Sequence, residues 1–377
     1  MKRHLGLYLH IPFCTHRCEY CSFYLEVYHE GRVARFLEAL SAEIRFYAER
    51  NVSRDDPFHS IYFGGGTPTV LRGRRLVRLL AEIRQMLPVA AECEVCVEAH
   101  PATTSEADLA MLAESGVNRI SFGAESMNEE ELLRIGRRAA VSDTARAVFQ
   151  ARKAGFTNIN LDLMYGLPGQ SIEDWRQTIA HSLDLSPAHL SCYALTIEPG
   201  TKLAHDIVQN RIPGPDEGLQ LAMDETAHEM LDRAGYHRYE ISNYAKTGFE
   251  CRHNLLYWTG GEYLGLGPSA QSFVDGVRFG NVADLSAYER ALTESRLPVE
   301  GFAKLSRGEQ QRDAVVFGLR LARGVPADIF RRHVEQYGQA DAAAELYATG
   351  LIVEHQSRVK LTAGGRRYAD TIAEKLY

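Results

Sequence analysis

Strand-like and helix-like segments alternate along the first 235 residues of this chain, and this alternation restricts its fold more than any other feature. Apolar runs such as "LGLYLHI" (5–11) and "SIYF" (60–63) are each followed by apolar residues at helical spacing. Six such repeats predict an α/β fold of parallel strands joined by right-handed crossovers. The other expected strands are 93–99, 118–122, 157–163 and 189–195, and helices are expected at 32–50, 74–86, 105–115, up to 154, 171–184 and 216–234.

A polar or glycine-rich segment follows each expected strand. Parallel α/β proteins gather their functional groups at the carboxyl ends of the strands. An open doubly wound sheet would concentrate such groups at one switch point, whereas here nearly every strand contributes. The pattern therefore favours a barrel or partial barrel. The segments are a cysteine-rich loop, "GGGTP" (64–68), Glu98, "GAES" (123–126), Asp162 and residues 193–196.

The loop after the first strand holds Cys14, Cys18 and Cys21 in the spacing C-x3-C-x2-C. Thiolates are the usual ligands of iron–sulfur clusters, and this spacing fits three corners of a [4Fe–4S] cluster. The alternative is a zinc site completed by His10 or His16. The chain has seven cysteines, an odd number, and a secreted disulfide framework would spread and pair them. Clustered thiols indicate a metal site in a reducing, cytoplasmic setting.

Charge and hydropathy exclude several classes of function. The net charge is −7 and Lys/Arg runs are short, which argues against a dedicated nucleic-acid binder. No apolar span approaches the length of about 18 residues that indicates a transmembrane helix, so no integral membrane segment is expected.

Among the other polar residues, Glu98 and Asp162 at strand ends suit a polar ligand, but they also suit structural partners. Arg137 is either a carboxylate partner or a helix-surface charge.

Taken together, these segments resemble the radical S-adenosylmethionine (SAM) superfamily, in particular its coproporphyrinogen-dehydrogenase-related branch. The resemblance implies a partial (β/α)6 barrel of the TIM type, a [4Fe–4S] cluster on the three cysteines, and SAM on the fourth iron. It also implies an electron donor such as flavodoxin or ferredoxin. The matching segments are "YLHIPFCTHRCEYC", "GGGTPT", the strand end at Glu98, "SFGAES", "NLDLMYGLPGQ" and "YALTIEPGT".

The same resemblance implies roles for individual residues. Contacts to a first SAM match Tyr8, Gly65, Glu98 and Thr196, and contacts to a second match Tyr20, Gly66, Thr67, Arg137 and Asp162. Position 125 departs from the family, because Glu125 stands where glutamine is usual. A carboxylate cannot donate as an amide does, which puts the second SAM in doubt. His100 replaces the usual asparagine before a proline.

A later motif, H-N-x-x-Y-W, comprises His253, Asn254, Tyr257 and Trp258. It is similar to the motif that marks the haem-chaperone (HemW) group of this branch. An imidazole can ligate iron, aromatic rings can stack on the macrocycle, and Asn254 can orient a propionate or the imidazole. The alternative is that His253 is a hydrogen-bonded core histidine and Trp258 a core residue. Cys251 is either an axial thiolate or an ordinary buried cysteine.

The resemblance to this group implies a cytoplasmic haem chaperone that passes haem to acceptor apoproteins, with a homodimer implied by the resemblance alone. A SAM-cleaving C-methyltransferase or cyclopropane-forming enzyme is the alternative, so whether the chain is an enzyme stays open. Coproporphyrinogen III dehydrogenase is disfavoured, because Phe23 replaces its fourth cysteine and only seven residues precede Tyr8. The expected domains are the radical SAM barrel (1–235), a connecting region with the H-N-x-x-Y-W motif (236–299) and a mostly helical, winged-helix-like domain similar to the HemN C-terminus (300–377).

Overall fold

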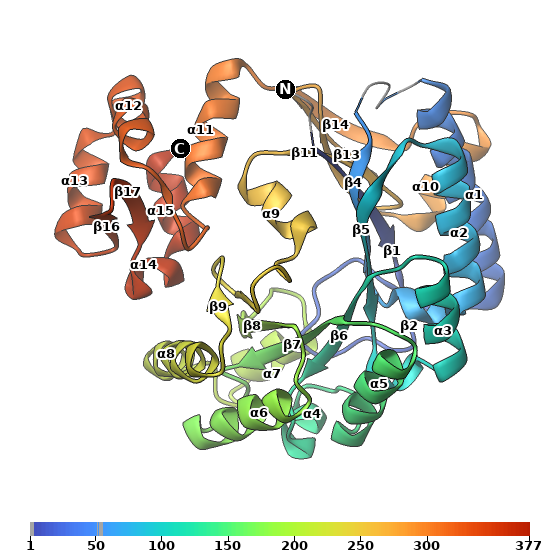
Figure 1. Cartoon of the computed structure of the whole chain (residues 1–377), viewed down its shortest axis with the longest axis horizontal. Coiled ribbons are helices and arrows are strands. Elements are labelled where there is room, and N and C mark those ends of the chain that lie inside the picture. Colours follow the sequence, from blue (N-terminus) through green and yellow to red (C-terminus); the bar gives the residue numbers. More distant parts are fainter. Residues whose placement is uncertain (1–3, 51, 53–55) are drawn as a thin grey trace.

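The computed structural model describes residues 4–50, 52 and 56–377. Its main feature is a curved sheet with a run of six parallel strands in the order β1-β4-β5-β6-β7-β8 (Figure 1). The predicted α/β partial barrel is confirmed, and each expected strand is present. The bounds are β1 Leu5–Ile11, β4 Phe58–Gly65, β5 Val89–Ala99, β6 Arg119–Glu125, β7 Asn158–Tyr165 and β8 His189–Ala194.

Helices cover the convex face of this sheet (Figure 1). Each presents an apolar stripe to the strands; in α1, for example, Val33, Phe36, Leu40 and Ile44 are buried at helical spacing. The helices fall close to the expected ranges, with the segment before residue 154 divided in two. They are α1 Glu30–Glu49, α2 Arg72–Met86, α3 Glu106–Glu114, α4 Glu129–Arg134, α5 Val141–Lys153, α6 Ile172–Asp184 and α8 Glu217–Arg233.

Register brings the polar strand ends to one level. Glu98 of β5 pairs with Ser121 of β6, and Gly123 of β6 pairs with Asp162 of β7. Side chains in register on neighbouring strands point to the same face of a sheet. The carboxylates of Glu98 and Asp162 therefore share the concave side, as expected for a barrel that holds a ligand at the carboxyl ends of its strands.

Residues 236–304 extend the sheet at both edges, which the sequence analysis did not anticipate. β11 (Glu262–Leu266) runs parallel to β1 and begins an antiparallel meander, and β10 (Asn243–Ala245) pairs with β8. The full order is β14-β13-β12-β11-β1-β4-β5-β6-β7-β8-β10-β9, so the described sheet is an arc with two free edges. The remaining strands are β12 Gln271–Val274, β13 Val277–Asn281, β14 Val299–Lys304 and β9 His237–Arg238.

A buried carboxylate fastens this extension to α1. Glu43 is fully buried and accepts hydrogen bonds from the Gly267 amide (2.8 Å), the Asn281 amide group (2.6 Å) and the Tyr288 hydroxyl (2.6 Å). Burial raises the pKa of Glu43 to about 7. Tyr288 lies on α10 (Leu285–Thr293), so one side chain connects α1 with the β11–β13 segment and α10.

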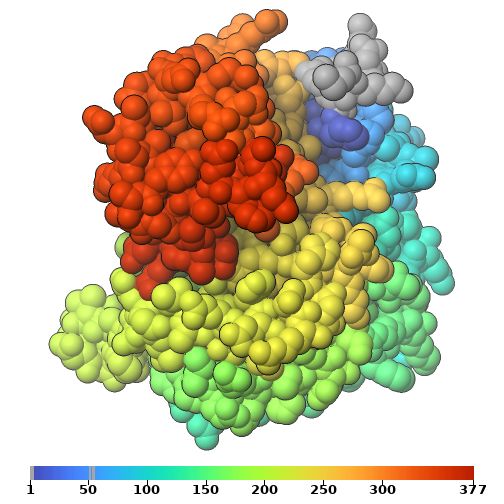
Figure 2. Space-filling view, turned by 60° about the vertical axis from the view of Figure 1, so that its left-hand side comes forward, coloured from blue at the N-terminus to red at the C-terminus, as the bar shows by residue number. Residues whose placement is uncertain are grey.

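The C-terminal segment has an apolar core of its own, formed by residues between Val315 and Leu376. Its hairpin of β16 and β17 and its final helix match the winged-helix expectation, and Figure 2 shows it resting on the segment that contains α8. The elements are α11 Arg307–Gly318, β15 Val325–Pro326, α12 Ala327–Tyr337, α13 Ala340–Ala348, β16 Ile352–His355, β17 Arg358–Leu361, α14 Ala363–Arg367 and α15 Ala369–Leu376. The domain boundaries 1–235, 236–299 and 300–377 stay a prediction. In the described part of the chain, every helix is too short or too polar to cross a membrane.

Candidate functional site

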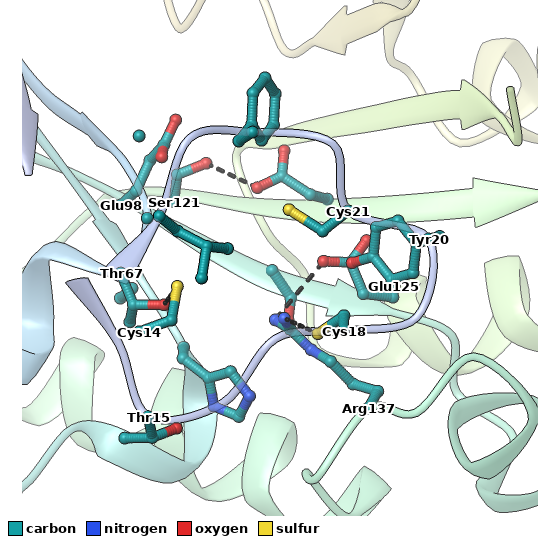
Figure 3. Close-up of a pocket in the computed structure, with 18 of the residues that line it drawn as sticks. Cys14, Thr15, Cys18, Tyr20, Cys21, Thr67, Glu98, Ser121, Glu125 and Arg137 are labelled. Carbon is teal, nitrogen blue, oxygen red and sulfur yellow. Dashed lines mark hydrogen bonds and ion pairs between the residues drawn. The ribbon is translucent and has the colours of Figure 1, made fainter. Parts of the chain in front are cut away.

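A cavity of about 450 Å³ lies at the carboxyl ends of the parallel strands (Figure 3). Its size is typical of small-molecule sites. It brings together most of the residues that the sequence analysis selected from far-apart segments. These are Cys14, Cys18, Tyr20, Cys21, Gly65, Gly66, Thr67, Glu98, Glu125, Arg137 and Asp162.

The glycine-rich loop holds the cysteine loop in place by backbone hydrogen bonds. The amide of Gly66 donates to the Ile11 carbonyl and the amide of Thr67 to the Phe13 carbonyl, both at 2.8 Å. A Cβ atom on Gly66 would lie 2.7 Å from the Phe13 carbonyl oxygen, and Gly65 has φ of +102°. Glycine is therefore required at both positions, mainly so that two chain segments can approach closely.

The three thiols line the same cavity and none forms a disulfide. Figure 3 shows Cys14 and Cys21 facing the space that their loop encloses. The Cys14 sulfur lies 3.3 Å from the Thr67 hydroxyl, and the Arg137 guanidinium donates to the Cys18 sulfur at 3.7 Å. Burial raises the pKa of the Cys14 and Cys21 thiols, so thiolates there need a cation to offset the loss of water.

The two histidines proposed as a fourth ligand differ. His10 contacts the Tyr8 hydroxyl through Nδ1 (3.2 Å) and the Tyr24 carbonyl through Nε2 (3.3 Å), so both its ring nitrogens are engaged. His16 lies within the cysteine loop, between Cys14 and Cys18, with Nε2 3.9 Å from the Cys18 sulfur. Three thiols on one loop, with polar groups beside them, fit the donor set of an iron–sulfur cluster.

Two carboxylates lie deeper in the cavity. Glu98 accepts a hydrogen bond from the Tyr62 hydroxyl at 2.8 Å, and burial raises its pKa to about 7, with the charge of Asp162 adding to the rise. Asp162 accepts from the Ser121 hydroxyl at 3.1 Å. His100, only 5% exposed, has a buried Nε2 without a hydrogen-bond partner. A polar ligand in this cavity would supply the hydrogen-bond partners that these groups lack, since unpaired buried polar atoms are unfavourable.

Glu125 is already paired with the arginine that was expected to hold a ligand. Its carboxylate lies 3.4 Å from the Arg137 guanidinium, with side chains 12% and 10% exposed. Glu125 has φ of +65°, and the β6–β7 register shifts beside it. Burial raises the Glu125 pKa, while Arg137 opposes the rise. The position expected to contact a second SAM therefore contains an internal ion pair.

Comparison with known proteins agrees with this geometry. The profile of the Radical SAM superfamily matches residues 8–181. "Heme chaperone HemW" of Mycobacterium tuberculosis (strain ATCC 25618 / H37Rv) is 35% identical, over 98% of this chain and 94% of its own. The protein of that name from Bacillus subtilis (strain 168) is 34% identical over 95% of each chain. The chain belongs to the HemW family.

The structure of coproporphyrinogen III oxidase (HemN) from Escherichia coli, described as a radical SAM enzyme, is similar in fold. The TM-score is 0.85 at 24% identity, with 100% of this chain and 90% of HemN covered. The match therefore extends through the sheet extension and the C-terminal segment of this HemW-family chain.

The H-N-x-x-Y-W residues of this HemW-family chain lie outside the first cavity, and all four are on α9 (Arg252–Trp258). α9 lies on the concave side of the sheet (Figure 1). His253 is 1% exposed, with Nδ1 2.8 Å from the Ser60 hydroxyl and Nε2 2.8 Å from the Tyr257 hydroxyl. Burial lowers the pKa of His253 to about 3. In this conformation His253 is a hydrogen-bonded core histidine.

The motif nevertheless contacts the cavity indirectly. The His253 ring stacks on Tyr62, with centroids 5.1 Å apart, and Tyr62 donates to Glu98. Tyr8 stacks in the same group, while Asn254 is half-buried. Thr196, expected near the first SAM, lines a second cavity instead.

Sequence reasoning did not select several residues that line the first cavity. Tyr62 and Ser121 are examples, and each lies on a strand with its side chain on the concave face. The available signal was the period of two along each strand, because Tyr62 precedes Gly64 by two positions and Ser121 precedes Gly123 by two.

Proposed function

We propose that this chain is a cytoplasmic haem chaperone that binds haem and delivers it to acceptor apoproteins. One observation carries the proposal: relatives named "Heme chaperone HemW" match it over nearly the whole length of both chains. In this proposal, haem would bind at the H-N-x-x-Y-W motif on α9 and the cavity beside it.

The first cavity would hold a [4Fe–4S] cluster on Cys14, Cys18 and Cys21, and SAM beside it. When bound, such a cluster supplies an electron and an open iron for the amino and carboxylate groups of SAM. Arg137 would donate a hydrogen bond to a cluster thiolate, as it does to the Cys18 thiol here, and the Thr67 hydroxyl, 3.3 Å from the Cys14 sulfur, could donate to that thiolate. The Glu98 carboxylate would accept from a SAM hydroxyl or amine, with Tyr62 orienting it.

Tyr20, Gly65, Gly66 and Asp162 line the same cavity and would surround SAM. Tyr8 would act through its contact with Tyr62. The internal Glu125–Arg137 pair favours a single SAM, and this disfavours the alternative of a methyltransferase that uses two. The expected reductant is an acidic electron carrier such as flavodoxin or ferredoxin, and a homodimer is part of the proposal.

Haem would contact His253, Asn254, Tyr257 and Trp258. Iron ligation by His253 would require its Nδ1 or Nε2 to leave Ser60 or Tyr257, and the loss of one such hydrogen bond costs about 1 kcal/mol. An iron–imidazole bond can offset that amount. The arrangement suits reversible binding, in which the hydrogen bonds of His253 to Ser60 and Tyr257 form again after haem leaves.

The test is a haem titration of the anaerobically reconstituted chain, with and without SAM, followed by transfer to an apoprotein such as apomyoglobin. We expect one haem per chain, a Soret band that weakens in His253→Ala, and complete transfer. A folded, cluster-containing chain that leaves the haem spectrum unchanged, or that methylates a substrate without haem, would overturn the proposal.

A further inference from the structure

A second cavity, of about 360 Å³, lies between the end of the barrel and the C-terminal segment. Thr196 and Gln220 contribute from the barrel side, while Arg320, Arg366 and Arg367 contribute from the C-terminal side. Tyr193 lines both this cavity and the first one, so the two spaces adjoin. Two aspartates, Asp224 and Asp370, line the cavity together with the three arginines, and the excess of positive charge suits an anionic ligand.

Arg366 shares its carboxylate partner, Asp224, with another arginine. Its nearest partner, Asp224, lies 3.7 Å away and already receives two hydrogen bonds from Arg238, at 2.5 and 3.1 Å. The Nε of Arg366 is buried without a hydrogen-bond partner. Burial and the charge of Arg238 lower the pKa of Arg366. A ligand carboxylate here would satisfy a guanidinium that the protein leaves underpaired.

The partners of the other two arginines are exposed. Arg320 pairs with Asp370, whose side chain is 89% exposed, and Arg367 with Glu217, which is 77% exposed. Exposed ion pairs contribute little to stability, so a bound anion can replace these carboxylates readily. Arg367 also donates to the Glu217 backbone carbonyl. A ligand carboxylate would therefore replace the side-chain partners of Arg320 and Arg367, while that backbone hydrogen bond stays in place.

This cavity is connected to the H-N-x-x-Y-W motif. The Arg320 guanidinium lies over the Trp258 ring, with its central carbon 4.7 Å from the ring centroid. The indole Nε1 of Trp258 is buried and has no hydrogen-bond partner. One wall of the arginine cavity thus touches the aromatic side chain that would stack on a macrocycle.

We propose that this second cavity binds the two carboxylates of a tetrapyrrole, the propionates of haem, through Arg366 and Arg367, with Arg320 between them and Trp258. The inference rests on the proposed function and assigns it a second binding element. Guanidinium groups suit this task because they bind carboxylates with two parallel hydrogen bonds. The macrocycle would then extend from the arginines toward Trp258 and α9.

The test compares haem with haem dimethyl ester, in which both carboxylates are neutral, by absorbance titration of the reconstituted full chain. The wild type should bind haem about tenfold or more tightly than the diester, as expected for charged hydrogen bonds. Arg366→Gln/Arg367→Gln should bind haem about tenfold or more weakly and should no longer distinguish it from the diester.

The matched control is Arg331→Gln/Arg332→Gln, which removes the same charge from exposed positions on α12 of the same segment. It should bind both ligands as the wild type does. Equal affinity of the wild type for haem and the diester, or a retained preference in the folded double variant, would overturn the inference while the chaperone proposal stands. A wild type that binds no haem overturns both. If the double variant unfolds by circular dichroism, the ester comparison on the wild type decides.

Discussion

Replacement of Glu125 by glutamine should open a second SAM site. At 3.4 Å the attraction between Glu125 and Arg137 is about 5 kcal/mol at an effective dielectric constant of about 20, and desolvation of the two ions offsets much of it. A ligand carboxylate must now compete with Glu125 for the guanidinium. In Glu125→Gln that competitor is neutral, and a charged hydrogen bond worth about 1.5–3 kcal/mol becomes available to the ligand.

This gain corresponds to roughly a ten- to hundredfold tighter binding of a second SAM. Equilibrium dialysis of SAM against the cluster-reconstituted chain measures it directly. We expect one SAM per wild-type chain and two per Glu125→Gln chain. Glu130→Gln is the matched control, because it removes the same charge from an exposed pair with Arg134 on α4.

The explanation requires Arg137 to be the group that is released. Addition of Arg137→Gln to Glu125→Gln should therefore abolish the second binding event. The reasoning is refuted if the Glu125→Gln isotherm superimposes on that of the wild type, or if the second event persists without the arginine.

Three further predictions follow from the site. Cys18→Ala should lose the brown colour and about four irons per chain, as measured by iron analysis, while Cys192→Ala, away from the loop, should retain both. SAM affinity should fall as the pH is lowered through about 7, because protonation of Glu98 (pKa about 7) removes its acceptor charge. The Glu98→Gln variant should bind SAM more weakly than the wild type at high pH, and its affinity should not change with pH. A wild-type affinity that stays constant across this pH range would contradict the prediction. His253→Ala should lower the free energy of unfolding by about 2–4 kcal/mol in urea, since Ser60 and Tyr257 both lose a partner, whereas half-buried Asn254→Ala should change it little.

Much of the fold was predictable because the parallel strands are short apolar runs separated by amphipathic helices. Leu5–Ile11 and His189–Ala194 fall within a residue of their expected positions. The cavity was predictable for a related reason: parallel strands deliver their carboxyl ends to one edge, so Cys14, Glu98 and Asp162 meet although they are far apart in sequence.

The sheet extension was not predictable by the same signals. "GGEYLGLGPSAQSF" contains β11 and the start of β12, but its glycines interrupt the period of two on which strand recognition depends. Its position is determined by tertiary contacts, among them the hydrogen bonds that Glu43 accepts from Gly267 and Asn281. A single carboxylate in a helical pattern does not indicate such partners.

The hydrogen bonds of His253 could not be predicted from the sequence either. Its partner Ser60 lies 193 positions earlier, on a strand whose side chains alternate between two faces. The motif identifies the residue types but gives no information on which of them face one another. The ion pair between Glu125 and Arg137 was unpredictable for a similar reason, since Glu125 has an unusual backbone conformation with φ of +65° that its residue type does not indicate.

The free edges of the described sheet have a mechanical consequence. Strands β14 and β9 each pair on one side only, with β13 and β10, so no strand ladder joins the two ends of the arc. The C-terminal segment is joined to the rest of the chain by interactions such as the hydrogen bond from the Ala322 amide to the Tyr239 carbonyl and the contact of Arg320 with Trp258. A barrel closed by strand pairing would have a fixed diameter. Here the open side of the arc faces the C-terminal segment (Figure 1), which has a sheet of its own, so a movement of that segment would change the width of the opening without breaking the main sheet.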